Sequence, residues 1–460
     1  MIALTLAEIA DVTGGVLQGP PDLLVDGTVV TDARLAEPGS LYVARVGEHA
    51  DGLDFVPQAV ERQAAAVLAE RPSTQLASVV VPDVQAAFAA VAREVVARVP
   101  AVQVVAVTGS SGKTSTKDLL AQVLSEHAPT VATAESFNGE VGVPLTACRV
   151  DADTAHLVLE MGARGIGHIR YLTEIVRPDV AVVLNVGTAH VGEFGSVDAV
   201  AQAKAELVEA LTTDGVAVLN TDDPRVRAMA DRTKGRVVLV GRSDDAQVRA
   251  DDVVLDDQAR ASFTLVHGGE RAVVRLALHG EHHVSNALAV AAVGLEVGMT
   301  LPDVAAALGR ARPASRWRME VRDRPDGVRI VNDAYNANPE SMRAALKALA
   351  GMGEGRRTWA VLGEMLELGD SSLLEHDAIG RLAVRLNVKR LVAVGPGARA
   401  IHTGATQEGS WGEESVHVPD VEAAYALLSA ELEPGDVVLL KSSRDAGLRY
   451  LGDRLAGACA

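Results

Sequence analysis

Residues 104–114, which read V-V-A-V-T-G-S-S-G-K-T, decide the fold. The four small apolar residues at the start predict a buried strand of a parallel sheet. The two glycines let the backbone turn its N–H groups inward, and the helix expected over 115–125 adds positive potential at its N-terminus. A strand, a glycine-rich turn and a helix in this order indicate an α/β domain that binds phosphate groups.

The side chains of this loop favour a nucleoside triphosphate as the ligand. Lys113 adds a full positive charge, and Thr114 places a hydroxyl where Mg²⁺ bridges two phosphates. The loop is shorter than a standard Walker A motif, because Val107 stands where that motif has its first glycine. A chance Gly-Lys-Thr in a surface turn is the alternative, which the flanking strand and helix make weak. The expected phosphate-binding residues are Gly109, Ser110, Ser111, Gly112, Lys113, Thr114 and Ser115. The loop alone does not separate a kinase, a GTPase, a motor or a ligase.

Length and composition narrow the class of protein. At 460 residues the chain is long enough for about three domains. The formal net charge of −18 disfavours nucleic acid and anionic membranes as partners, since no cluster of basic residues opposes it. Two cysteines outside any CxxC pair, no signal-like N-terminus and no apolar run long enough to span a bilayer predict a reduced, cytoplasmic protein.

The pattern of strands and helices predicts three α/β domains, at 1–98, 99–312 and 313–460. In the first, Thr5 and Glu8 have the spacing of a capping box before a helix over 4–12. Strands are expected there at 25–31, 40–46 and 65–69. Continuous apolar runs predict parallel strands in the other two domains, at 157–160, 180–185, 216–220, 327–331, 358–362, 390–394 and 436–440. The third domain therefore reads as a doubly wound, Rossmann-like sheet.

Three polar residues stand at or beyond the carboxyl ends of central strands, where ligands of parallel sheets bind. Glu160 could hold Mg²⁺ opposite Thr114, or be a helix-start glutamate stabilised by the helix dipole. His190 is an unusual ligand for Mg²⁺, and a lone histidine is more often structural. Lys204 and Glu206 fall on different faces of a predicted helix, and composition alone favours a solvated Lys204.

Six motifs together resemble those of one family, the Mur ligases. The phosphate loop is followed by Glu160-Met161-Gly162-Ala163, Ala189-His190, and Ala203-Lys204-Ala205-Glu206, as in the central domain of that family. Residues 333–342, D-A-Y-N-A-N-P-E-S-M, and 362–369, L-G-E-M-L-E-L-G, resemble the third domain of the members that add D-alanyl-D-alanine. The resemblance covers all three segments in the expected order. It implies a small UDP-binding domain, a central P-loop ATPase domain and a C-terminal Rossmann-like domain.

The resemblance implies an ATP-dependent amide ligase of peptidoglycan synthesis. Its substrates would be UDP-MurNAc-tripeptide and D-Ala-D-Ala, and an acyl phosphate would be the intermediate of the reaction. The enzyme would be a monomer. The alternatives are another Mur ligase, which usually carries a DYAHxP-type segment where this chain has 333–339, or a folylpolyglutamate synthase-like ligase, which lacks the first domain. A P-loop protein without activity would show damage at Lys113, Glu160, His190 or Lys204, and none is visible.

The resemblance also implies roles for individual residues. Lys113, Glu160, His190 and Lys204 would be catalytic, with Thr114, Glu160, His190 and a CO₂-derived carbamate on Lys204 holding two Mg²⁺ ions. The nucleotide would further contact Asn286, Arg318, Asp333, Tyr335 and Asn336, and the remaining substrates Thr31, Asn138, Gly142, Pro144 and Asn338. Since the ATP residues come from both the second and the third domain, we expect the site to be completed by closure of those two domains. The chain departs from the family pattern at Leu53, Gly139 and Ser442.

Overall fold

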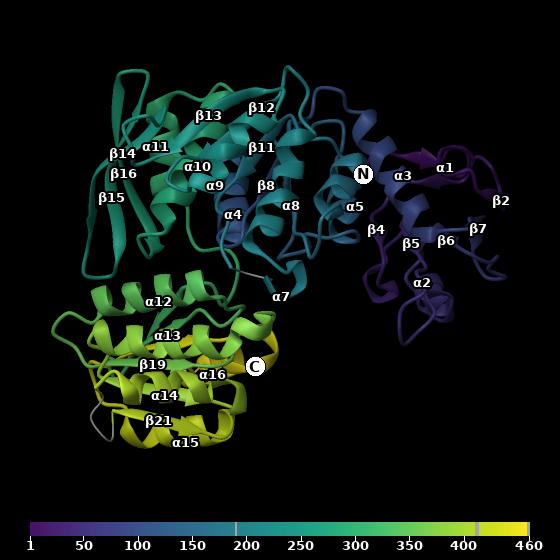
Figure 1. Ribbon diagram of the computed structural model, residues 1–460. Coiled ribbons are helices and arrows are strands. Elements are labelled where there is room, and N and C mark those ends of the chain that lie inside the picture. The colour runs from purple at the N-terminus through teal and green to yellow at the C-terminus, as the bar shows by residue number, and fades with distance from the viewer. Residues whose placement is uncertain (189–190, 410–413, 458–460) are drawn as a thin grey trace.

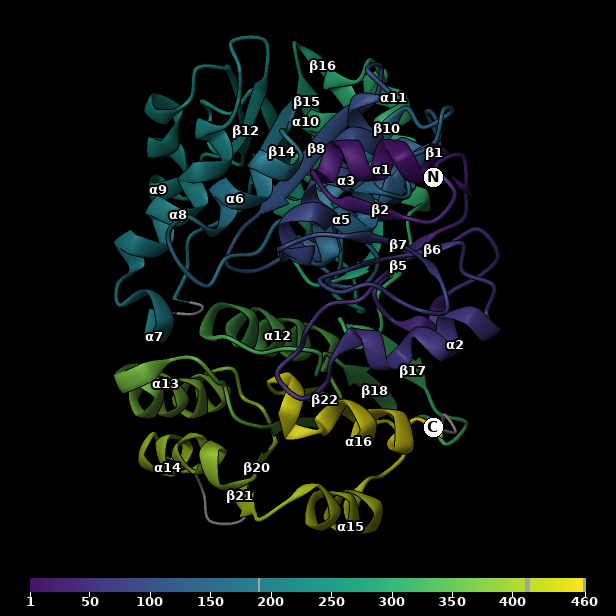
Figure 2. The ribbon, with the colours of Figure 1, turned by 90° about the vertical axis from the view of Figure 1, so that its right-hand side faces the viewer.

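The computed structural model describes residues 1–188, 191–409 and 414–457. These residues form three α/β domains, each built around its own principal sheet (Figure 1). The N-terminal domain lies to one side of the central domain (Figure 1), and the C-terminal domain lies beneath the central domain in both views (Figure 2). The three-domain α/β fold that the sequence predicts is therefore confirmed. Among the described helices, none combines the length and the apolar character needed to cross a membrane.

The N-terminal domain has a five-stranded sheet in the order β2-β7-β6-β5-β4, parallel except for β2. Thr5 and Glu8 form the predicted capping box of the first helix. The single strand expected over 25–31 is wrong: two short strands flank Gly27, where a side chain would collide with the 38–40 turn. The elements are β1 Leu4–Thr5, α1 Leu6–Thr13, β2 Val16–Gln18, β3 Leu24–Val25, β4 Val29–Val30, η1 Ala33–Leu35, β5 Leu41–Val43, η2 Gly52–Phe55, α2 Val56–Glu61, β6 Ala66–Ala69, β7 Ala77–Val80 and α3 Val84–Ala97.

The central domain carries a nine-stranded sheet in the order β16-β15-β14-β13-β12-β11-β8-β10-β9. The strands from β9 across to β14 are parallel, as the continuous apolar runs predict. The strands of this domain are β8 Gln103–Thr108, β9 Thr130–Ala132, β10 His156–Glu160, β11 Val180–Val183, β12 Val216–Asn220, β13 Arg236–Gly241, β14 Val248–Leu255, β15 Arg260–His267 and β16 Glu270–His279. The strand β8 is the one that leads into the glycine-rich loop, and it lies well inside the sheet.

Helices cover both faces of the central sheet, so β8 and its neighbours are buried on both sides. The helix α4 that follows the glycine-rich loop packs against α10. The helices are α4 Lys113–Ser125, α5 Gly142–Ala147, α6 His168–Ile175, α7 Val191–Phe194, α8 Val197–Glu209, α9 Pro224–Arg227, η3 Ala228–Arg232, α10 His283–Glu296 and α11 Leu301–Arg310. The antiparallel ribbon β14–β16 extends the sheet beyond the parallel part, and the sequence interpretation did not anticipate it.

The C-terminal domain has a six-stranded sheet in the order β17-β18-β22-β19-β20-β21, parallel except for the edge strand β17. This doubly wound topology confirms the Rossmann-like prediction. The elements are β17 Glu320–Asp323, β18 Arg329–Asn332, α12 Pro339–Met352, β19 Thr358–Leu362, η4 Gly369–Ser371, α13 Ser372–Arg385, β20 Arg390–Val394, η5 Pro396–Ala398, α14 Arg399–Gln407, β21 Ser415–Val418, α15 Val421–Glu431, β22 Val437–Lys441, η6 Arg444–Ala446 and α16 Leu448–Leu455.

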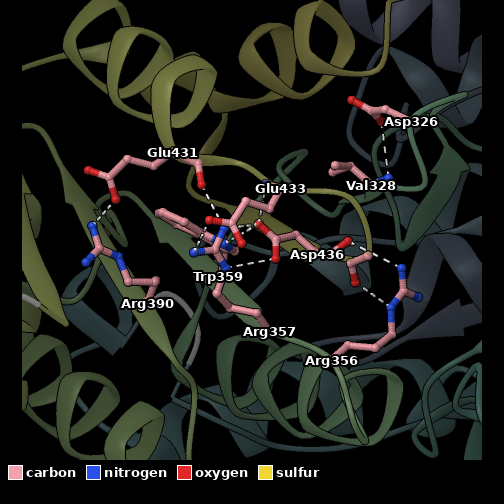
Figure 3. A network of polar contacts seen from close by, with 10 residues as sticks. Asp326, Val328, Arg356, Arg357, Trp359, Arg390, Glu431, Glu433 and Asp436 are labelled. Carbon is pink, nitrogen blue, oxygen red and sulfur yellow. Dashed lines mark hydrogen bonds and ion pairs between the residues drawn. The ribbon is translucent and has the colours of Figure 1, made fainter.

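A polar network closes the end of this sheet at which β19 and β22 begin (Figure 3). The buried Asp436 carboxylate accepts hydrogen bonds from Arg357, from the indole of Trp359 and from the backbone N–H of Glu433. Arg357 also lies over the Trp359 ring. The network connects the first residues of the neighbouring parallel strands β19 and β22. The carboxyl ends of both strands therefore lie together at the opposite end of the sheet.

Candidate active site

A cleft of about 1180 Å³ lies between the central and C-terminal domains. Both sheets direct the carboxyl ends of strands toward it, because its lining comes from the loops after β8, β10 and β11 on one side and after β18, β19 and β22 on the other. This is the position at which open parallel sheets bind their ligands. Among the described residues, the lining of the cleft includes none from 1–98.

The glycine-rich loop forms one wall of the cleft and is held rigid by its neighbours. Asn185, at the end of β11, accepts a hydrogen bond from the Ser111 N–H at 2.9 Å and donates one to the Ser111 carbonyl at 3.1 Å. Gly112 begins α4 with φ of 81°, and a Cβ there would lie 2.7 Å from the Asn286 amide oxygen. Glycine is therefore required at 112 both by the backbone angle and by the close approach of α10.

The side chains of Lys113, Lys204 and Arg318 bring three positive charges into this part of the cleft, with few carboxylates near them. Lys113 Nζ donates to the Gly109 carbonyl at 2.7 Å, and its pKa is lowered by burial and by the nearby Arg318, against the attraction of Glu160. The pKa of Lys204 is lowered well below its usual range, chiefly by burial and also by Lys113. A triphosphate would neutralise such a cluster, so the electrostatics favour a polyanionic ligand.

Glu160 and Thr114 lie on the same side of the cleft and offer oxygen ligands. The Glu160 carboxylate is buried; Oε1 accepts from the Asn138 amide at 2.8 Å, and Oε2 has no partner among the described residues. The Thr114 hydroxyl is 3.3 Å from that of Ser136. A buried carboxylate oxygen without a donor is costly unless a cation completes it. Carboxylate and hydroxyl oxygens are the ligands that Mg²⁺ prefers, so this pair fits the ion.

Helix α8 places Lys204 in the cleft and Glu206 on a different face, as the helical spacing predicts. The Glu206 carboxylate accepts from the backbone N–H groups of Gly167 and Arg170 at 2.6 and 3.0 Å, and so anchors the start of α6. Lys204 is buried at 4% exposure and has no hydrogen-bond or ion-pair partner in the part of the chain that the structure describes. The solvated lysine that composition alone favours is therefore wrong.

The C-terminal domain contributes Arg318, Asp333, Tyr335 and Asn336 to the opposite wall. The Arg318 guanidinium lies 4.3 Å from the centre of the Tyr335 ring and donates to the Ser136 hydroxyl at 3.0 Å, so it connects the two domains. The Asp333 carboxylate is already engaged, because it accepts from Lys441 Nζ at 2.6 Å and from the Met319 N–H at 3.0 Å. Asp333 thus also holds the turn that carries Tyr335.

The cleft includes most, though not all, of the residues to which the sequence resemblance assigns a role. Asn138, Gly142, Asn286 and Asn338 line it. Gly109 lies just behind the lining and meets Lys113 through its carbonyl. Pro144 is buried within α5, and Thr31 belongs to the N-terminal domain, so the structure brings neither to this cleft. His190 lies outside the described residues.

Some cleft residues were not selected from the sequence. Asn185 braces the glycine-rich loop, and Glu340 reaches the loop after β11 from the other domain. Arg449 lies over the Trp317 ring and lines the cleft near its C-terminal wall. Asn185 carried a usable signal, since it stands at the carboxyl end of a predicted parallel strand. Glu340 and Arg449 carried none, because their positions depend on how the domains dock.

Three α/β domains, with a glycine-rich loop of the phosphate-binding type that faces the C-terminal domain across a cleft, place the chain in the class of P-loop proteins. Family models match most of the chain: the Mur ligase family catalytic domain at 28–114, the Mur ligase middle domain at 107–294, and the Mur ligase glutamate ligase domain at 317–444. The chain belongs to the Mur ligase family.

Comparison with individual proteins shows which members of the Mur ligase family this chain is similar to. The chain is 48% identical to the UDP-N-acetylmuramoyl-tripeptide--D-alanyl-D-alanine ligase of Mycobacterium tuberculosis, with 99% of this chain and 98% of that protein covered. The enzyme of the same name from Escherichia coli is 35% identical, with 97% of each covered. A crystal structure of MurF from Acinetobacter baumannii superposes with a TM-score of 0.90 at 32% identity, covering 99% of both chains. MurF from Thermotoga maritima, solved in complex with ADP, gives 0.81 at 28% identity, covering 94% of this chain and 98% of that one.

Proposed function

We propose that this chain is the ATP-dependent ligase that joins D-Ala-D-Ala to UDP-MurNAc-tripeptide in peptidoglycan synthesis. The observation that carries the proposal is the interdomain cleft. In it Lys113 and Lys204, neither of which has a carboxylate partner among the described residues, lie with Glu160, whose Oε2 has no partner there either. The resemblance over the full length to ligases of this name supports the choice of substrates.

The first chemical step activates a carboxylate, which by itself is a poor electrophile because its leaving group would be oxide. An oxygen of the tripeptide's terminal carboxylate attacks the γ-phosphorus of ATP, and ADP leaves with the electron pair of the broken P–O bond. Two anions must meet for this step, so the site needs positive charge. Lys113 would neutralise the β- and γ-phosphates, and backbone N–H groups of the glycine-rich loop would hold their oxygens.

The second step makes the amide bond. The amine of D-Ala-D-Ala attacks the acyl carbon, the tetrahedral species collapses, and inorganic phosphate leaves. The proton that the amine loses ends on the departing phosphate, which leaves as HPO₄²⁻. Arg318 and the turn that holds Tyr335 would close over the nucleotide from the C-terminal domain and keep water away from the acyl phosphate.

Magnesium would be held by Thr114 and Glu160, with His190 and a modified Lys204 as ligands of a second ion. When bound, Mg²⁺ supplies positive charge between the phosphates and the acceptor carboxylate. The orphan oxygen of Glu160 supports the first ion. Burial of Lys204 supports the modification, because a lowered pKa leaves a neutral amine that can attack CO₂. The resulting carbamate is an anion, which removes the repulsion between Lys204 and Lys113.

Other properties of the chain belong to the same proposal. We place the domain limits at 1–98, 99–312 and 313–460, supported by the gaps between α3 and β8 and between α11 and β17. The nucleotide would contact Asn286, Asp333 and Asn336. The muramoyl peptide would contact Asn138, Gly142 and Asn338, with Thr31 at the uridine end, whereas the buried Pro144 would support the start of α5. The enzyme would be a cytoplasmic monomer serving cell-wall growth, cell shape and cell division.

Phosphate release tests the proposed reaction directly. With purified protein, ATP, Mg²⁺ and UDP-MurNAc-tripeptide, we expect phosphate release only when D-Ala-D-Ala is added, together with a product whose mass equals the sum of the two substrates less one water. L-Ala-L-Ala at the same concentration is the matched control. Turnover with single amino acids and none with D-Ala-D-Ala would reject the assignment. Varying the third peptide residue between lysine and diaminopimelate in the same assay would define the acceptor.

The carbamate is tested by chemical rescue. The Lys204→Ala variant should lose activity by about 10²-fold, the range found when one group that stabilises developing charge is removed. Acetate or formate should partly restore it, because a free carboxylate can replace the missing anion. Lys113→Ala is the control and should not respond to acetate, since it lacks a cation rather than an anion. Full activity of Lys204→Ala would exclude the carbamate role.

A further inference from the structure

Helix α12 begins in a way that turns one acidic side chain outward. Its N-cap Asn338 and Ser341 satisfy each other through reciprocal hydrogen bonds, and Pro339 needs no N–H partner. Glu340, at the second helical position, is therefore not needed to cap its own helix. Its carboxylate extends across the domain boundary to the loop that follows β11.

The contact across the boundary is specific. Glu340 Oε1 accepts from the backbone N–H of Thr188 at 2.9 Å and from the Thr188 hydroxyl at 3.0 Å. The neighbouring Gly187 leaves room for the carboxylate, because a Cβ there would lie 2.6–3.0 Å from its atoms. Two hydrogen bonds to one charged oxygen make this a stronger interdomain contact than a surface ion pair.

The loop after β11, to which Glu340 is hydrogen-bonded, is also hydrogen-bonded to the phosphate loop. The Gly187 N–H donates to the Ser110 hydroxyl at 2.9 Å, and the Asn338 amide donates to the Ser110 carbonyl at 3.4 Å. Ser110, Gly187 and Thr188 of the central domain are thus linked to Asn338 and Glu340 of the C-terminal domain in a closed ring, through these hydrogen bonds and the short stretches of chain between the residues. A shift of α12 relative to the central sheet must alter the phosphate loop through this ring.

The second carboxylate oxygen of Glu340, Oε2, lacks a hydrogen-bond donor among the described residues. It is buried, although Glu340 lines the cleft. A desolvated carboxylate oxygen without a donor opposes closure, whereas the bonds of Oε1 favour it. The two effects make the position of α12 against the central domain sensitive to hydrogen-bond donors that ligands bring into the cleft.

We propose that Glu340 is a positioning residue that couples the seating of the C-terminal domain to the geometry of the phosphate loop. The kinetic part of this proposal rests on the proposed ligase function, while the coupling itself concerns only nucleotide-dependent closure. The partner of Glu340 is Thr188, and the two should act as one unit.

Small-angle scattering and kinetics together test the coupling. With a non-hydrolysable ATP analogue, Mg²⁺ and UDP-MurNAc-tripeptide, the radius of gyration of the parent protein should fall. Glu340→Ala should keep less than half of that change and lose about tenfold in kcat, the effect expected when hydrogen bonds to a charged group no longer favour one state. Glu340→Gln, which keeps an acceptor oxygen, should restore most of the compaction. Glu354→Ala, exposed just beyond α12, is the matched control and should behave as the parent.

A double-mutant cycle separates coupling from a general structural role. Thr188→Val should weaken compaction less than Glu340→Ala does, and the double variant should be no worse than Glu340→Ala alone, since both changes remove one contact. Thermal unfolding should be the same for all variants within the error of the measurement. Full compaction of Glu340→Ala, or additive losses in the double variant, would overturn the proposal. Compaction that follows this pattern in a protein without ligase activity would instead reject the proposed function alone.

Discussion

Replacing Lys113 by alanine is expected to lower kcat/KM by about 10³-fold, the scale on which cationic groups act in phosphoryl transfer. Lys113 is partly buried and lies near Lys204 and Arg318, where reduced solvation strengthens its interaction with phosphate oxygens. In the described structure its ammonium rests on the Gly109 carbonyl, a contact that a bound triphosphate would replace. The loss should appear in kcat more than in KM, because the charge on the transferring group is redistributed in the transition state.

The measurement is steady-state kinetics combined with thermal unfolding. Lys113→Ala should unfold at the temperature of the parent or slightly higher, since it removes a desolvated cation that has no carboxylate bonded to it. Lys347→Ala, on the exposed face of α12, controls for loss of a lysine. If Lys113→Ala keeps more than a tenth of the parent kcat/KM, Lys113 does not act on the transferring phosphate.

Local chemistry explains what the sequence could predict. The capping box at Thr5 and Glu8 and the glycine-rich loop at 109–114 depend on residues that are close in the chain, so their geometry follows from spacing. The parallel strands were recognisable because both of their faces are buried, which makes every position apolar. Asn185 was not selected from the sequence, although the same rule could have found it, since it stands at the end of a predicted parallel strand.

Contacts between distant segments were not predictable in the same way. The ribbon of β14 to β16 has one face on the core and one exposed, and its alternating polar residues read as surface. Lys204 is buried and has no partner within 1–188, 191–409 and 414–457, which contradicts what composition favours, so only a family resemblance indicated a role for it. Glu340 has no helical or strand pattern that predicts Thr188 as its partner, because that contact exists only after two domains dock.

The largest effect on stability should come from the far end of the C-terminal domain, where Asp436 is buried (Figure 3). Burial alone would raise the pKa of its carboxyl group, but hydrogen bonds from Arg357, the Glu433 N–H and the Trp359 indole outweigh burial and lower it. The carboxylate is therefore more stable in the folded protein than in the unfolded chain. Asp436→Ala would remove it and leave the guanidinium of Arg357 and the Trp359 N–H without this acceptor.

We expect Asp436→Ala to destabilise the C-terminal domain by about 3 kcal/mol, the scale for breaking one side of a buried ion pair. Calorimetry should show its transition about 10 °C lower, given a few degrees per kcal/mol for a domain of this size. Glu433→Ala is the matched control: its side chain is 70% exposed and pairs with Arg357 at 3.5 Å, so its removal should change stability by less than about 1 kcal/mol.

The effect should also depend on pH in one direction. Because folding lowers the pKa of Asp436, its contribution is fully present above the unfolded pKa of about 4 and is lost as the pH falls through the folded value. The difference in stability between the parent and Asp436→Ala should therefore be constant near neutral pH and shrink below about pH 4. A difference that stays constant in acid would mean that packing around Trp359, rather than the charge of Asp436, holds this end of the sheet together.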